Sequence, residues 1–172
     1  KKKKGRRNVQ NALLKVAASD SFWAVRKEAV SGLAALKPKQ YAKELIELSE
    51  EQDNRVKRAI WGALKNYKGN KDVSELLQRT IASDQKYYSI SDAFRALVVV
   101  DTAAANRMVD DLLQTDSHTD VIRKAAISYF GSVKNDRNYE RLKELVSYGG
   151  TTWDASPSAV TQLGKYVKEK KE

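Results

Sequence analysis

The residues best suited to catalysis lie in one short stretch, Asp116-Ser117-His118-Thr119-Asp120. It holds a hydroxyl, the one histidine of the chain and two carboxylates, which are the groups of a hydrolytic Ser–His–Asp triad. A triad needs a base that is oriented from across the fold, whereas these residues are neighbours in one turn. The sequence therefore predicts a solvated turn here and no catalytic residue.

Metal and cofactor sites lack their usual signatures. The chain has no cysteine, a single histidine, and neither an H-E-x-x-H pair nor a glycine-rich phosphate loop. No apolar run approaches the roughly 20 residues that cross a bilayer. We therefore expect a soluble chain with no metal, no cofactor, no membrane span and no enzymatic activity by itself, while its compartment stays open.

Net charge is the feature that points to nucleic acid. The formal charge is +10, but residues 1–7 hold six cations and no anion, and the last eight residues hold four lysines against two glutamates. Residues 8–164 therefore carry only +2. We interpret residues 1–7 as a basic tail or linker, and the body gives little reason to expect nucleic acid as a partner.

Any binding residues must be positioned by elements that repeat along the chain. Val25-Arg26-Lys27-Glu28-Ala29-Val30 is nearly identical to Ile122-Arg123-Lys124-Ala125-Ala126-Ile127, and weaker copies begin at Val56, Ser89 and Ala155. The five starts are 31, 33, 33 and 33 residues apart. Four positions after each start stands a small or apolar residue (Ala29, Ile60, Ala93, Ala126, Ala159), and eight positions after it a large apolar one (Leu33, Leu64, Leu97, Phe130, Leu163).

Each copy predicts two amphipathic helices, because its apolar residues recur at helical spacing and strand signals are missing. First helices are expected near 8–18, 39–50, 71–83, 102–115 and 136–147, and second helices near 22–36, 54–67, 86–100, 119–132 and 156–170. A lone helical hairpin cannot bury its apolar face, whereas a stack of hairpins can. The fold class is therefore all-α: an α-solenoid with a period of 31–33, forming one domain over 8–172 with repeats near 8–37, 38–68, 69–101, 102–134 and 135–172.

Two sets of residues recur among the repeats and could contact a ligand, the first of them, with one member per repeat, on the concave face. One set is a series of cations on the second helices: Lys27, Arg58, Arg95, Lys124 and Lys165. Such a stripe would attract phosphates or acidic peptides, although Glu28 and Asp92 lie nearby and a mixed-charge face is usually only solvated. The other set is the aromatic series Trp23, Tyr87 and Trp153, which could stack a ligand but more simply packs between repeats.

The stretch Ala18–Ala29 resembles a known repeat. The period and the Asp20-x₅-Arg26 spacing resemble HEAT repeats in general. More narrowly, the stretch is similar to the first full repeat of the C-terminal HEAT-like domain of aminopeptidase N-like zinc metallopeptidases, commonly Asp-Pro-Phe-Trp-Gly-Val-Arg-x-Glu-Ala. The matching residues that we take as its structural signature are Asp20, Phe22, Trp23, Val25, Arg26 and Ala29. Ser21 replaces the usual proline and Ala24 the usual glycine.

This resemblance implies a non-catalytic scaffold or substrate-gating domain whose partner is the catalytic part of a parent polypeptide. Zinc would then be held only in that catalytic part, outside this chain. Two alternatives stay open. One is a nucleic-acid-binding protein similar to the HEAT-like alkylpurine DNA glycosylases, for which Asp84 and Asp120 are the nominal catalytic carboxylates. The other is a protein–protein adaptor with a peptide or protein ligand on its concave face.

Overall fold

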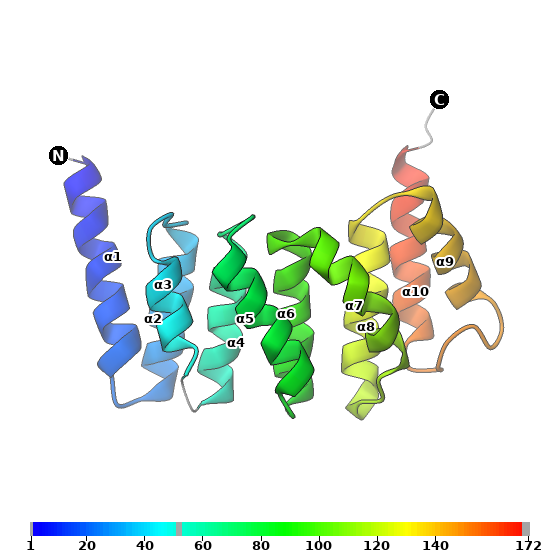
Figure 1. The fold of residues 1–172 in the computed structure, drawn as a ribbon, viewed down its shortest axis with the longest axis horizontal. Coiled ribbons are helices and arrows are strands. Elements are labelled where there is room, and N and C mark those ends of the chain that lie inside the picture. Colours follow the sequence, from blue (N-terminus) through cyan, green and yellow to red (C-terminus); the bar gives the residue numbers. More distant parts are fainter. Residues whose placement is uncertain (1, 51–52, 170–172) are drawn as a thin grey trace. The chain divides into compact units, whose positions relative to one another are not determined.

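All regular secondary structure is helical in residues 2–50 and 53–169, which are the residues that the computed structural model describes. The helices are α1 (Lys2–Ser19), α2 (Trp23–Ala35), α3 (Ala42–Leu48), α4 (Asn54–Leu64), α5 (Lys71–Ser83), α6 (Tyr87–Val100), α7 (Thr102–Gln114), α8 (Val121–Ser132), α9 (Asp136–Val146) and α10 (Ser156–Leu163). Short 3-10 helices, η1 (His118–Asp120) and η2 (Gly164–Glu169), precede α8 and follow α10. The all-α class is confirmed (Figure 1).

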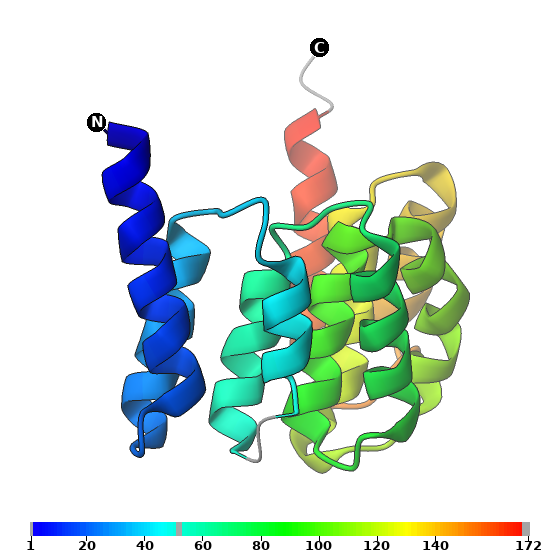
Figure 2. The ribbon, with the colours of Figure 1, turned by 60° about the vertical axis from the view of Figure 1, so that its left-hand side comes forward.

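The chain divides into two compact units, Lys1–Asp101 and Thr102–Glu172. In unit 1, α1 packs on α2, α3 on α4 and α5 on α6, so that three helical hairpins follow one another. The second helices α2, α4 and α6 lie side by side, which the two views of the ribbon both show (Figures 1 and 2). Unit 2 repeats the plan with the hairpins α7–α8 and α9–α10, and its second helices α8 and α10 are in contact. Each unit is therefore a solenoid-type stack of HEAT-like hairpins.

The repeat pattern correctly locates the core. All five residues at the fourth position after each repeat start are buried, and so are Leu33, Leu64, Leu97 and Phe130 at the eighth position. Leu13 and Leu163, which lie on the first and last α-helices of the described residues, are only half-buried. A stacked hairpin buries both of its faces, whereas these two helices each have a neighbour on fewer sides.

Polar side chains in the turns cap the starts of several helices. The side chain of Asp53 accepts a hydrogen bond from the Arg55 N–H at 2.9 Å at the start of α4, and Asn135 accepts one from the Asn138 N–H at 2.8 Å at the start of α9. Pro157 lies in the first turn of α10, where its missing N–H removes no helical bond. Pro38 lies in the loop before α3, which begins only at Ala42.

The first helix differs most from expectation. It begins at Lys2 and not near residue 8, so the described part of the basic segment is helical. Lysine and arginine are good helix formers, and no proline interrupts the segment. The segment therefore extends the helix α1, which packs on α2. Lys1 and residues 170–172, which belong to the two charged ends, lie outside the described residues.

Candidate functional site

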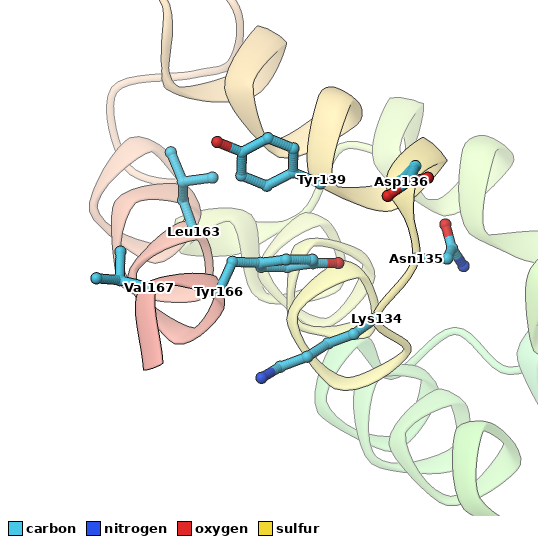
Figure 3. Close-up of a pocket in the computed structure, with 7 residues that line it drawn as sticks. All are labelled: Lys134, Asn135, Asp136, Tyr139, Leu163, Tyr166 and Val167. Atoms are coloured by element: carbon cyan, nitrogen blue, oxygen red, sulfur yellow. The ribbon is translucent and has the colours of Figure 1, made fainter. Parts of the chain in front are cut away.

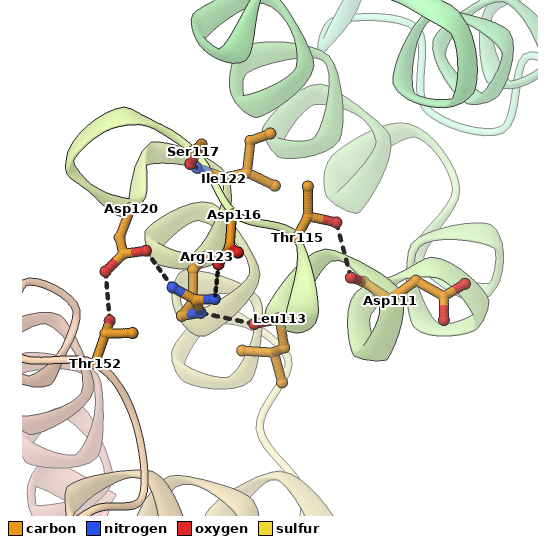
Figure 4. Close-up of polar contacts among 9 residues, drawn as sticks. All are labelled: Asp111, Leu113, Thr115, Asp116, Ser117, Asp120, Ile122, Arg123 and Thr152. Carbon is orange, nitrogen blue, oxygen red and sulfur yellow. Dashed lines mark hydrogen bonds and ion pairs between the residues drawn. The ribbon is translucent and has the colours of Figure 1, made fainter.

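The Ser–His–Asp stretch is a turn in the structure and does not form a relay. His118 is exposed, and the Ser117 hydroxyl oxygen accepts a hydrogen bond from the Ile122 N–H at 3.0 Å. Asp120 is buried and bonded to Arg123 and to the Thr152 hydroxyl (Figure 4). The side chains of Ser117 and Asp120 thus make hydrogen bonds that stabilise this turn.

Arg123 is the centre of that turn. Its Nε donates to the Leu113 carbonyl at 2.7 Å, its Nη2 pairs with Asp116 at 3.0 Å, and its Nη1 donates to Asp120 (Figure 4). The guanidinium therefore ties the end of α7 to the start of α8, and Asp120 passes the connection on to the loop before α10 through Thr152. A buried cation of this kind is tolerated because each of its three guanidinium nitrogens donates to an acceptor.

Arg26 holds the equivalent position in the first repeat. Its Nη1 donates to the backbone carbonyls of Asp20 at 2.8 Å and Ser21 at 3.2 Å. The Asp20 carboxylate in turn accepts from the Phe22 N–H at 2.9 Å. The conspicuous charged residues of the repeat signature thus fix the turn between two helices.

The apolar part of the signature divides between core and surface. Ala29 is buried and Trp23 is half-buried, but Phe22 is 56% exposed and Val25 40% exposed. Phe22 is the N-cap residue that precedes α2, and Val25 lies in the first turn of the helix. The signature therefore leaves apolar surface at this end of unit 1.

Arginines of α4 stack on aromatic rings of both neighbouring helices. The guanidinium carbon of Arg55 lies 3.4 Å from the centre of the Trp23 ring on α2, and that of Arg58 lies 5.0 Å from the centre of the Tyr88 ring on α6. Both distances are within the range of cation–π attraction. Arg55 and Arg58 are three residues apart, so they share a face of α4. We call the residues of this surface the aromatic–arginine row: Phe22, Trp23, Arg55, Arg58, Tyr87 and Tyr88.

Each arginine of the aromatic–arginine row is paired with a carboxylate. Arg55 holds Asp53 through Nε at 3.1 Å and Nη2 at 2.7 Å, and these hydrogen bonds lower the pKa of Asp53 to about 2. The Nε of Arg58 lies 2.6 Å from Asp92 of α6. Together with these two carboxylates, the row is nearly neutral, although its two arginines are permanent cations.

Three of the five cations expected to form a stripe lie in unit 1. Lys27 pairs with Glu28 at 3.4 Å, Arg58 pairs with Asp92, and the Nε of Arg95 donates to the Ser91 hydroxyl at 3.4 Å. The contacts with Glu28 and Asp92 balance two of the three charges, whereas the Ser91 hydroxyl is neutral. Whether the three residues contact a ligand stays a prediction.

The other two expected cations lie in unit 2 and also have partners. Lys124 donates to the Thr119 carbonyl at 2.8 Å, and Lys165 donates to the Gln162 side chain at 2.5 Å. Asp84, a nominal carboxylate of the glycosylase alternative, accepts from the Lys86 N–H at 2.9 Å. A catalytic role of Asp84 or Asp120 stays a prediction.

The aromatic series does not behave alike in the three repeats. Trp23 packs between α2 and α4, but Tyr87 is 45% exposed and Trp153 is 92% exposed. Trp153 stands in the loop from Ser147 to Ala155, which turns through Gly149 at a φ of +77°. Packing between repeats, the simpler expectation, thus holds for Trp23 and not for Trp153, because the long loop moves the latter off the helix.

Unit 2 also contains a cavity that the sequence did not predict. It has a volume of about 540 Å³ and lies between the start of α9 and the end of α10 with η2 (Figure 3). Tyr139 and Tyr166 contact each other there with ring centres 5.2 Å apart, and Lys134 donates to the Lys165 carbonyl at 2.9 Å. Its lining mixes apolar side chains with one lysine and one aspartate, so it defines no single ligand chemistry.

Two further findings concern metals and membranes. In residues 2–50 and 53–169, no group of three or more histidine, cysteine, aspartate or glutamate side chains is placed to hold a metal ion. Over the same residues, no helix combines the length and the apolar character that a membrane span requires.

Comparison with known families identifies the architecture. The profile of HEAT repeats matches residues 11–98, which is about half of the chain. The chain belongs to the HEAT-repeat family. No curated protein gives a significant match. HEAT repeats are in general non-catalytic and commonly mediate protein–protein interaction, so the chain is a helical-repeat scaffold.

Within this HEAT protein, the aromatic–arginine row is the surface best suited to bind a partner. Tryptophan, tyrosine and arginine are the residue types that contribute most to protein interfaces. Arg55 and Tyr88 were not expected from the sequence to contribute. The sequence offered two signals, the adjacent tyrosines Tyr87-Tyr88 and the i,i+3 spacing of Arg55 and Arg58. Neither signal identifies the contacts, because the aromatic rings that the two arginines stack on lie about one repeat away along the chain.

Proposed function

We propose that this HEAT domain is a non-catalytic scaffold or substrate-gating domain that docks on a partner protein through the aromatic–arginine row. The carrying observation is the combination of half-exposed Phe22, Tyr87 and Tyr88 with arginines that are already neutralised and stacked. A nearly neutral aromatic surface suits a protein interface, whereas a polyanion would need unpaired cations.

We propose further that the partner is the catalytic domain of an aminopeptidase N-like metallopeptidase, joined to this chain in one polypeptide. The support for this is the resemblance of Asp20–Ala29 to the first HEAT-like repeat of those enzymes. Zinc and all catalytic residues would belong to the partner domain. A free adaptor for a separate protein is the second candidate, because the same surface would serve it equally well.

The reading frame upstream of Lys1 distinguishes the two candidates. The aminopeptidase proposal expects an in-frame H-E-x-x-H motif, which supplies the zinc ligands and the general base of such enzymes. A translation start immediately before Lys1 would contradict it and leave the adaptor.

The role of the row is tested in the polypeptide that this reading frame encodes. We expect the double variant Phe22→Ala, Tyr88→Ala to change kcat/KM for long peptides about tenfold while the value for a short aminoacyl substrate stays near that of wild type. The reason is that loosened docking alters access to the active site and not the chemistry. Trp153→Ala is the matched control, since it removes an exposed aromatic residue outside the row. Equal effects of the double variant and the control would contradict the role of the row.

A further inference from the structure

The aromatic–arginine row presents hydrogen-bond donors that its own fold does not use. Within the part of the chain that the structure describes, the hydroxyls of Tyr87 and Tyr88 and the indole N–H of Trp23 make no hydrogen bond. Arg55 donates to Asp53 through Nε and Nη2, and Arg58 donates to Asp92 through Nε, which leaves further guanidinium N–H groups of both residues for an outside acceptor. The row therefore suits a ligand that offers exposed oxygen acceptors.

The charge of the row restricts the ligand to a neutral one. Its two arginines are matched by Asp53 and Asp92, and the nearby Lys27 by Glu28. An acidic ligand would have to displace these carboxylates, and a basic ligand would meet two guanidinium groups. Charge complementarity thus selects an uncharged segment.

The spacing of the row restricts the conformation of the ligand. Neighbouring packed helices such as α2, α4 and α6 are about 8–10 Å apart. A polyproline II helix has three residues per turn and advances about 9 Å per turn, so one of its faces would meet each successive helix of the row. Its carbonyl groups make no internal hydrogen bonds and remain available as acceptors. An α-helix, by contrast, satisfies most of its carbonyl groups within itself.

We propose that the aromatic–arginine row binds an extended, uncharged, proline-containing segment of the partner in the polyproline II conformation, an inference that rests on the proposed function. Apolar residues of the segment lie against the Phe22–Trp23 pair at the start of α2 and, two turns further along, against Tyr88 of α6, with the α4 arginines between them. The tyrosine hydroxyls and the guanidinium groups donate to its carbonyl oxygens. Such a segment loses little conformational entropy on binding because proline restricts it beforehand.

The probe is a fluorescein-labelled peptide of about twelve residues with proline at every third position and otherwise alanine, leucine and glutamine. We expect saturable binding to the full chain by fluorescence anisotropy, with little dependence on salt. Tyr88→Ala should weaken binding about fivefold or more, and Tyr88→Phe, which removes only the hydroxyl, should weaken it about threefold. Trp153→Ala should leave it unchanged, and a thermal melt shows that each variant is folded.

Three matched peptides show how the inference would fail. They are a glycine–serine peptide, an alanine-based helical peptide with leucines seven residues apart, and an acidic peptide. Stronger binding of the helical peptide would overturn the polyproline II conformation, since leucines at that spacing also recur at about 10 Å. Stronger, salt-dependent binding of the acidic peptide would overturn the neutrality argument. Equal binding of the proline and glycine–serine peptides, or none by either, would also overturn the inference. The proposed docking would survive if kcat/KM of the full polypeptide still responded to the row variants.

Discussion

Individual arginines in this protein connect its helices and turns. Arg26 and Arg123 hold equivalent repeat positions, and each reaches back to the turn that precedes its helix. Arg55 and Arg58 instead reach sideways to the neighbouring repeats. The same residue type thus fixes the turn within a hairpin and the contact between hairpins.

Replacing Arg123 is expected to cost more stability than replacing an exposed arginine. Arg123→Met leaves the buried carboxylate of Asp120 with Thr152 as its remaining partner and should lower the free energy of unfolding by about 3 kcal/mol. Urea denaturation followed by circular dichroism measures this. Arg137→Met is the control, because its pair with Asp110 is exposed on both sides, and it should change stability by about 0.5 kcal/mol or less. Similar losses in the two variants would show that the Arg123 contacts contribute little.

At the scale of elements, the turn after α9 is defined by its two glycines. Gly149 has a φ of +77°, and a Cβ atom on Gly150 would lie 1.9 Å from the Glu144 carbonyl oxygen. The Gly150 N–H donates to the Ser147 carbonyl at 2.9 Å, which closes the turn. Only glycines allow α9 to end this sharply before the long loop to α10.

Alanine substitutions at two glycines should therefore have opposite effects on the stability of the chain. Gly150→Ala must push the backbone away from Glu144 and is expected to destabilise the chain by about 1–2 kcal/mol. Gly62→Ala, inside α4 and with nothing within 4 Å of its Cβ, should stabilise it by about 0.5–1 kcal/mol. The midpoints of thermal unfolding measure both effects. A Gly150→Ala variant as stable as wild type would show that the turn can relax.

Helix positions followed from the sequence wherever turn residues and apolar spacing agreed. The expected helices at 71–83, 86–100 and 102–115 correspond closely to α5, α6 and α7. The last second helix was expected to reach residue 170, but α10 ends at Leu163 and continues as η2 from Gly164. The apolar pattern does not distinguish these two helix types, because Leu163 and Tyr166 are close on the surface of either.

At the scale of the whole molecule, the net charge is the least informative property. The +10 belongs mainly to the two ends of the sequence, and several cations of the body are paired. We expect only weak binding to duplex DNA at about 50 mM salt and its loss by about 200 mM, because the chain neutralises few phosphates at once. Fluorescence anisotropy across this salt range measures it.

Charge reversal separates a specific DNA surface from a diffuse one. Changing Lys27, Arg95 and Lys124 to glutamate should leave the residual DNA binding nearly unchanged if these cations form no binding stripe. A marked loss of affinity, beyond that expected from net charge alone, would restore the nucleic-acid alternative.

The repeat architecture was predictable from the sequence, but the candidate site was not. The period depends on apolar residues such as Leu33, Leu64 and Leu97, whose burial follows directly from stacking. The stacking of Arg55 on Trp23 and of Arg58 on Tyr88 joins side chains about 30 residues apart, and it depends on the side-chain rotamers of long residues. Spacing along the chain places such residues on neighbouring helices and does not say which of them meet.

The environments of the three tryptophans give this protein a built-in optical readout. Trp61 is 2% exposed and donates to the Ser89 hydroxyl at 3.0 Å, Trp23 lies against a guanidinium, and Trp153 is 92% exposed. Indole emission shifts to longer wavelength in water, and soluble quenchers such as iodide reach only exposed rings. Trp153 therefore dominates the red, quenchable part of the emission and Trp61 the blue, protected part. Because Trp61 lies in unit 1, a shift of the protected emission to longer wavelength follows the melting of that unit without an attached label, whereas the already exposed Trp153 of unit 2 supplies a nearly constant background.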